Sequence, residues 1–182
     1  MNSNFINCLL VKLLNFSLTT TLMTEVSDHL LSVLTAAEPL LRQLSPALAQ
    51  QKPRPDKWSP KEIIGHLIDS ACNNQQKFVR TMATPKLEFP AYAQDFWVSA
   101  QHYQEANWST LVDLWIAYNR HLAHVIRQVD PATLQHAILI QGAVPFTLQF
   151  IMADYVEHLK HHLSQIFPDG PFESKFANVY NA

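Results

Sequence analysis

Apolar residues recur at intervals of three or four in four stretches of the chain, a spacing that predicts amphipathic helices. The first stretch covers about residues 24–50, and the second begins after Ser59. The third begins at Ser109, and the fourth covers about residues 147–167. Four helices of this kind, each with one apolar face, predict an all-α fold in which they pack as a four-helix bundle.

Local signals place some of the helix ends. Ser59 is a good N-cap, Pro60 suits the first helical position, and Glu62 completes a capping box, so the second helix has a clear start. The first helix contains Pro39 and Pro46, either of which could bend or end it.

Two connections between the helices carry structure of their own. Residues 85–108 are too long and too aromatic for a simple linker, so we expect an ordered crossover with a short helix around 96–103. Such a crossover lets the second and third helices run parallel, which gives an up-down-down-up order. Before the fourth helix, residues 137–140 and 144–146 flank Gly142 and predict a small hairpin.

The length of 182 residues suits one domain. Residues 1–22 are interpreted as an extension, mobile or helical, or as a misassigned start, because Met23 opens a more ordinary N-terminus. Their apolar run is interrupted by Lys12 and is too short to span a bilayer, so we expect no membrane partner. Residues 23–182 then form the bundle domain, with a loosely packed tail after Pro171.

Composition narrows the class of protein. Apolar residues make up 48% of the chain and charged residues 15%, which is typical of a globular protein. A net charge of −2, without any run of Lys or Arg, argues against a nucleic-acid partner. Cys8 and Cys72 make neither a disulfide framework nor a metal-binding pair, which fits a reducing cytoplasm.

Three histidines are candidates for a metal site. His158 and His162 are four residues apart in the fourth helix, so their imidazoles stack on one face about 6 Å apart. His66 is the best third candidate. It lies ~10 Å along its helix from the Ser59 cap, whereas His158 and His162 lie ~14 Å and ~8 Å before the end of the fourth helix at Phe167. If these helices are antiparallel, all three histidines reach the same height. Such a set could hold one transition metal and leave positions open.

Periodicity also predicts the surroundings of the histidines. His66 lies away from the apolar face of its helix, on a side that it shares with Glu62, Asp69 and Asn73. We therefore expect a polar cleft at the rim of the bundle rather than a buried cage. His161 points about 100° away from its neighbour in the helix and is expected to face solvent.

Other chemistries find little support. A histidine on a helix is more often a surface or hydrogen-bonded residue than a ligand, so a metal-free bundle stays an alternative. A ferritin-like di-iron site needs Glu-x-x-His, whereas Glu62 and His66, like Glu157 and His161, are spaced by four. The sequence has no Gly-rich phosphate loop and no Gly-x-Ser-x-Gly motif.

The motifs resemble those of the DinB/YfiT-like superfamily of metal-dependent enzymes. The resemblance covers about residues 25–167 and is carried by three pieces: WSPKEIIGHLIDS at 58–70, PAY and DFW at 90–92 and 95–97, and HLKHHLSQI at 158–166. The first and last pieces are fairly specific when they occur together in this order.

The resemblance implies a four-helix bundle of up-down-down-up topology and a divalent metal, typically zinc or nickel. Carried over by position, the ligands are His66, His158 and His162. Characterised relatives include thiol-dependent S-transferases and isomerases that use low-molecular-weight thiols. Many relatives have Arg-Gly where Leu163-Ser164 stands here, and the family name implies no DNA polymerase activity.

Our first hypothesis is a metal-dependent enzyme, a thiol-dependent S-transferase or hydrolase that acts on a small molecule. Asp69 is a candidate to orient an imidazole, and Tyr92, Asp95 and Trp97 could wall a substrate cleft. The plainer interpretations are a solvated Asp69 and a Trp97 that plugs the bundle. The sequence identifies no catalytic residue beyond the metal ligands.

The second hypothesis is a non-catalytic metal-binding or stress-response protein, with a homodimer formed through an exposed helix face. The third is a metal-free bundle for partner contacts.

Overall fold

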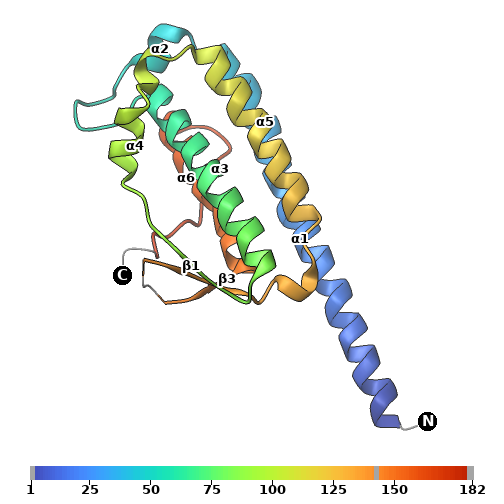
Figure 1. The fold of residues 1–182 in the computed structure, drawn as a ribbon. Helices are drawn as coiled ribbons and strands as arrows, with labels where there is room; N and C mark the ends of the chain where they lie inside the picture. The colour runs from blue at the N-terminus through green and yellow to red at the C-terminus, as the bar shows by residue number, and fades with distance from the viewer. Residues whose placement is uncertain (1–2, 142–143, 180–182) are drawn as a thin grey trace.

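The computed structural model describes residues 3–141 and 144–179. Its four long helices are α1 (Ser3–Gln43), α3 (Pro60–Ala83), α5 (Trp108–Arg127) and α6 (Leu148–Ile166). Helices α1 and α3 each contact both α5 and α6, so the four enclose a common core (Figure 1). The predicted four-helix bundle is therefore confirmed, with a small sheet added to it.

The first helix begins well before the predicted residue 24, and it ends before Pro46, one of the two prolines that could bend or end it. Helix α1 begins at Ser3 and continues through Pro39 to Gln43, and a separate helix α2 (Pro46–Gln50) follows. Ser45 caps α2, and Pro46 is the first residue of that helix. Proline has no N–H group, but the first N–H groups of a helix have no partner within the helix, so no hydrogen bond is lost there. The predicted division after residue 22 falls inside α1, whose first part projects beyond the other helices (Figure 1).

The start of α3 agrees with the sequence prediction and is tied to neighbouring segments. Ser59 Oγ accepts from the Glu62 N–H at 3.3 Å, and a Glu62 carboxylate oxygen accepts from the Ser59 N–H at 2.8 Å. Lys52 Nζ lies 2.9 Å from the Glu62 carboxylate, and Gln104 Nε2 donates to Ser59 Oγ at 2.7 Å. These bonds fix the helix one turn before His66.

The crossover between α3 and α5 is more structured than expected. It contains strand β1 (Lys86–Phe89), helix α4 (Gln94–Ala100) and the short 3-10 helix η1 (Tyr103–Glu105). Only a helix near 96–103 was predicted, and β1 was missed because four residues are too few to show a pattern.

A three-stranded sheet covers one end of the bundle. Strand β2 (Ala137–Ile140) pairs in parallel with β1 and antiparallel with β3 (Phe146–Thr147). The first strand of the predicted hairpin is confirmed, the second is shifted toward α6, and Gly142 lies outside the described residues. Thr147 then caps α6, since its hydroxyl accepts from the Phe150 N–H at 3.1 Å.

The polar side of α3 is buried, so the predicted rim location is wrong for this helix. His66 is 0% exposed and Asp69 3%, and Asn73 and Glu62 are buried as well. The crossover lies over this side, and the Tyr103 hydroxyl donates to Asp69 at 2.7 Å. Periodicity could not predict this cover, because it comes from a segment without a repeating pattern.

The tail after Pro171 is docked rather than loose. Phe172 is 1% exposed. The Ser174 hydroxyl donates to the Glu157 carbonyl at 2.8 Å, and the Lys175 N–H donates to the Glu157 carboxylate at 2.7 Å. The expectation of loose packing is therefore wrong for residues 172–176. Within the described chain, no helix has the length and apolarity needed to cross a membrane.

Replacing Gly65 by alanine should destabilise the fold. A methyl group at this position would overlap the ring of Tyr103, the residue that joins the crossover to α3. Alanine is the better helix former by about 1 kcal/mol, but overpacking of this kind costs about 1–3 kcal/mol. We expect Gly65→Ala to lower the free energy of unfolding, measured by urea denaturation with circular dichroism.

The matched control makes the same change in a Tyr103→Ala background. With the ring removed, Gly65→Ala should be neutral or stabilising. An equal loss of stability in both backgrounds would show that the Gly65–Tyr103 contact is not the cause.

Candidate metal centre

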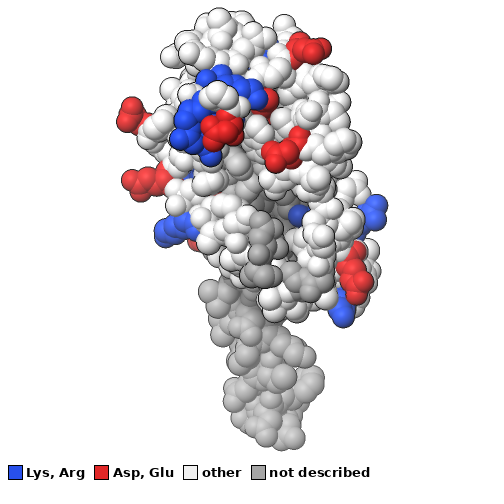
Figure 2. Space-filling model, turned by 90° about the vertical axis from the view of Figure 1, so that its left-hand side faces the viewer, with Lys and Arg blue, Asp and Glu red and all other residues white. Residues whose placement is uncertain are grey.

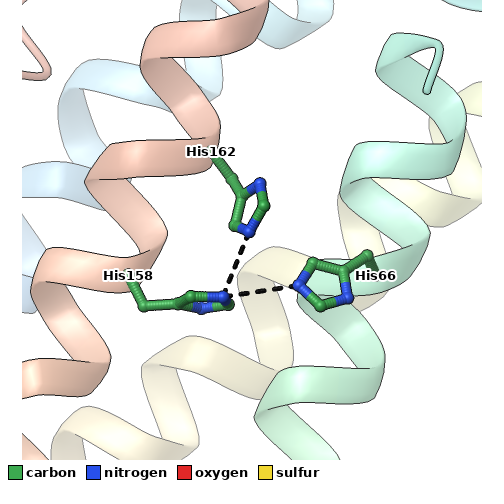
Figure 3. A group of neighbouring side chains, drawn as sticks. All are labelled: His66, His158 and His162. Carbon is green, nitrogen blue, oxygen red and sulfur yellow. Dashed lines mark hydrogen bonds between the residues drawn. The ribbon is translucent and has the colours of Figure 1, made fainter. Parts of the chain in front are cut away.

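Two helices bring the three predicted histidines together. His66 projects from α3, and His158 and His162 project from successive turns of α6 (Figure 3). The Nε2 atom of His158 lies 3.4 Å from Nε2 of His66 and 3.1 Å from Nε2 of His162. One ring nitrogen from each residue falls within 4.8 Å of the other two. Their assignment as metal ligands stays a prediction.

The spacing of the nitrogens suits a small divalent cation. Zinc–nitrogen bonds of about 2.0–2.1 Å in a tetrahedral site place the ligand atoms about 3.3 Å apart. Two of the nitrogen–nitrogen distances, 3.1 and 3.4 Å, lie on either side of this value. Three imidazoles are also a donor set that transition metals prefer, with positions left for water or substrate. The residues present therefore fit a divalent metal.

Hydrogen bonds on the far side of two rings favour the tautomer that a metal needs. Nδ1 of His162 lies 3.1 Å from the Gln165 side-chain oxygen, which can only accept, so that nitrogen carries the proton. Nδ1 of His158 lies 3.4 Å from the Ser70 hydroxyl, which can accept in the same way. A proton on Nδ1 leaves the lone pair on Nε2, which faces the cluster.

Burial keeps the rings neutral. Desolvation, followed by the nearby His162, lowers the pKa of His66 to about 3. Desolvation likewise lowers the pKa of His162 to about 4, although its bond to Gln165 acts in the opposite direction. The pKa of His158 falls well below its ordinary value, because burial is reinforced by the surrounding imidazoles. Neutral imidazole is the form that binds metals, so the cluster is ready to bind at pH 7.

Aromatic rings border the cluster. The Trp58 ring, from the segment before α3, lies 4.9 Å from the His66 ring and 6.3 Å from the His162 ring, centroid to centroid. The Phe176 ring, from the tail, lies 5.1 Å from the His158 ring. His161 lies between His162 and Phe176 and is partly buried, so it is less exposed to solvent than expected.

A family model described as the DinB superfamily matches residues 29–166, about three quarters of the chain. The chain belongs to the DinB superfamily. This confirms the resemblance carried by the sequence motifs, and all three histidines lie inside the matched range. A search of curated proteins finds no match.

The DinB fold is also found among solved structures. The chain is similar to YfiT from Bacillus subtilis, described as a probable metal-dependent hydrolase with an unusual four-helix bundle topology. The identity is 18%, the TM-score is 0.59, and the match covers 84% of each chain. At this identity the similarity establishes the shared fold.

Asp69 does not have the role predicted for it in this DinB domain. Its Oδ1 accepts from the Tyr103 hydroxyl and from Gln101 Nε2, both at 2.7 Å, so it anchors the crossover rather than an imidazole. Burial raises the pKa of Asp69, and these two hydrogen bonds oppose the shift. The rings of Tyr92 and Trp97 contact each other with centroids 4.9 Å apart and planes tilted by 57°, and their assignment to a cleft wall stays a prediction.

Sequence reasoning missed several residues that surround the histidines. Ser70 and Gln165 could have been found from their helical spacing, four residues after His66 and three after His162. Trp58 was visible only as part of a motif. Phe176 left no signal, because nothing in its local sequence indicates that the tail folds back onto α6.

Acidification should destabilise the metal-free protein. His66 has a pKa of about 3 when folded and 6.5 as its ordinary value, so between these pH values only the unfolded chain binds the proton. The stability from neutral His66 is complete above pH 6.5 and is lost as the pH falls toward 3. At pH 5 the loss from this residue is about 2 kcal/mol.

Urea denaturation of the chelator-treated protein at pH 7 and pH 5 measures this loss. His66→Gln should reduce the pH dependence, whereas His124→Gln, which changes an exposed histidine, should leave it unchanged. A wild-type stability that is equal at both pH values would contradict the burial of neutral imidazoles.

Proposed function

We propose that this protein is a metal-dependent enzyme that holds one divalent ion, zinc or nickel, on His66, His158 and His162. It acts as a thiol-dependent S-transferase or hydrolase on a small molecule. The convergence of three neutral Nε2 atoms carries the proposal. Membership of the DinB superfamily and the similarity to YfiT, itself described as a probable metal-dependent hydrolase, support it.

A divalent ion at this position would lower the pKa of a water molecule or thiol that binds to it, or polarise a carbonyl group. The protein supplies the arrangement around that chemistry. Gln165 and Ser70 hold two of the rings with Nε2 turned inward. His66 is held by the capped start of α3 and by burial. Three ligands leave one to three positions for nucleophile and substrate.

The thiol partner and the cell compartment belong to the same proposal. Low-molecular-weight thiols are kept reduced in the cytoplasm, which is where an enzyme that uses them would work. We also infer the up-down-down-up order of the four long helices. The crossover of β1, α4 and η1 supports this order, because it is long enough to return the chain to the end of the bundle where α3 begins.

A non-catalytic metal-binding or stress-response protein is the second candidate. The same histidine cluster would serve it, and Leu114, which is 48% exposed on α5, offers part of an apolar face for a homodimer. The two candidates differ in whether the bound metal accelerates a reaction.

Metal content tests the proposed site. Untagged protein should contain about one divalent ion per chain by mass spectrometry, and His66→Ala or His158→Ala should each remove most of it. Losing one of three ligands weakens binding steeply, because two imidazoles form only part of the coordination shell.

His124→Ala is the matched control, because it removes an exposed histidine from the same bundle and should leave the metal content unchanged. Equal metal content in all four proteins would disprove the three-histidine site. Activity then separates the two candidates. With zinc or nickel restored, an enzyme should consume a thiol faster in the presence of small electrophiles than His66→Ala does. A protein that only binds the metal should not.

A further inference from the structure

The C-terminal segment reaches the histidine cluster from outside the range that defines the family. The family model ends at residue 166, whereas Phe176 lies ten positions further on. Its ring meets the His158 ring edge-on at 5.1 Å and the His161 ring at 5.5 Å. This segment therefore borders the site from beyond the range that the family model matches.

Several bonds hold the segment in place. Phe172 is buried, and Glu157 on α6 accepts from the Lys175 N–H through its carboxylate and from the Ser174 hydroxyl through its carbonyl. The carboxylate also lies 2.8 Å from Lys160 Nζ, so it is itself fixed in position. Phe176 follows directly after these anchors, which makes its position a consequence of the fold.

Phe176 and Trp58 border different edges of the cluster. Trp58 faces the rings of His66 and His162, and Phe176 faces the ring of His158. Both residues are only partly buried, so neither is fully enclosed in the core. A molecule bound at an open metal position would therefore lie next to aromatic surface.

Charge is sparse over much of the face that carries α4. Figure 2 shows this face, where Lys, Arg, Asp and Glu gather toward the upper end and along the edges while the middle is largely uncharged. The upper end is where the loop between α2 and α3 lies, with Lys52, Arg54 and Asp56. A ligand that approaches over the middle of this face meets few charged side chains.

We propose that Phe176 is a specificity-determining residue of the metal centre and that it favours thiols with a flat apolar group beside the sulfur. The inference rests on the proposed function: a thiol sulfur held by the metal would place its substituent beside the Phe176 ring. Contact between aromatic rings strengthens binding by about 3- to 10-fold.

The test uses the full chain loaded with Co²⁺, whose absorption spectrum changes when a thiol sulfur binds. Benzyl mercaptan and 2-mercaptoethanol serve as probes, one with a flat apolar group and one without. In the wild type, benzyl mercaptan should bind more tightly. Phe176→Ala should weaken its binding about 3- to 10-fold and leave that of 2-mercaptoethanol within about 2-fold.

Two further variants make the test specific. Phe176→Leu keeps an apolar side chain without the ring and should retain part of the preference. Phe96→Ala removes an aromatic ring that is 68% exposed on α4 and should change neither affinity. An unchanged preference in Phe176→Ala, or an equal gain or loss for both thiols, would overturn the inference. Failure of the wild type to bind Co²⁺ would contradict the metal centre itself, and the inference with it.

Discussion

The close approach of three neutral imidazole nitrogens between α3 and α6 is the constraint on which the rest of the site depends. The Nε2 atom of His158 lies 3.1 Å from that of His162 and 3.4 Å from that of His66. Lone pairs on nitrogens this close repel each other unless a cation or a shared proton lies between them. Burial makes the protonated form costly, and this favours the metal ion that we propose for the three histidines. Gln165 and Ser70 accept from the Nδ1 atoms of His162 and His158, so the Nε2 lone pairs of these rings face the cluster. A cation between the rings would remove the repulsion among these lone pairs.

The crossover covers the polar side of α3, the helix that carries His66. It does so through the bond between Tyr103 and Asp69, while Gln104 links it to the cap of the same helix. Gly65 permits this contact because any side chain there would collide with the Tyr103 ring. Burial of His66, which is 0% exposed, lowers its pKa.

Much of the bundle and the choice of histidines could be predicted from the sequence. The caps at Ser59 and Thr147 are local signals, and His158 and His162 share a face by helical spacing alone. The burial of Asp69, strand β1 and the docking of Phe176 could not be predicted in this way. Each depends on contacts between segments far apart in the chain, and those contacts leave no periodic pattern. The family resemblance implied the same three histidines as ligands, and it gave no expectation for the tail.

The most direct test of the central claim is X-ray absorption at the metal edge of protein reconstituted with one equivalent of zinc. Three neutral imidazoles predict a shell of three nitrogen ligands at about 2.0–2.1 Å with the multiple-scattering pattern of histidine, completed by oxygen. The same spectrum from His66→Ala should contain one imidazole fewer. A shell of oxygen alone, or a sulfur ligand at about 2.3 Å in the wild type without added thiol, would contradict the three-histidine centre.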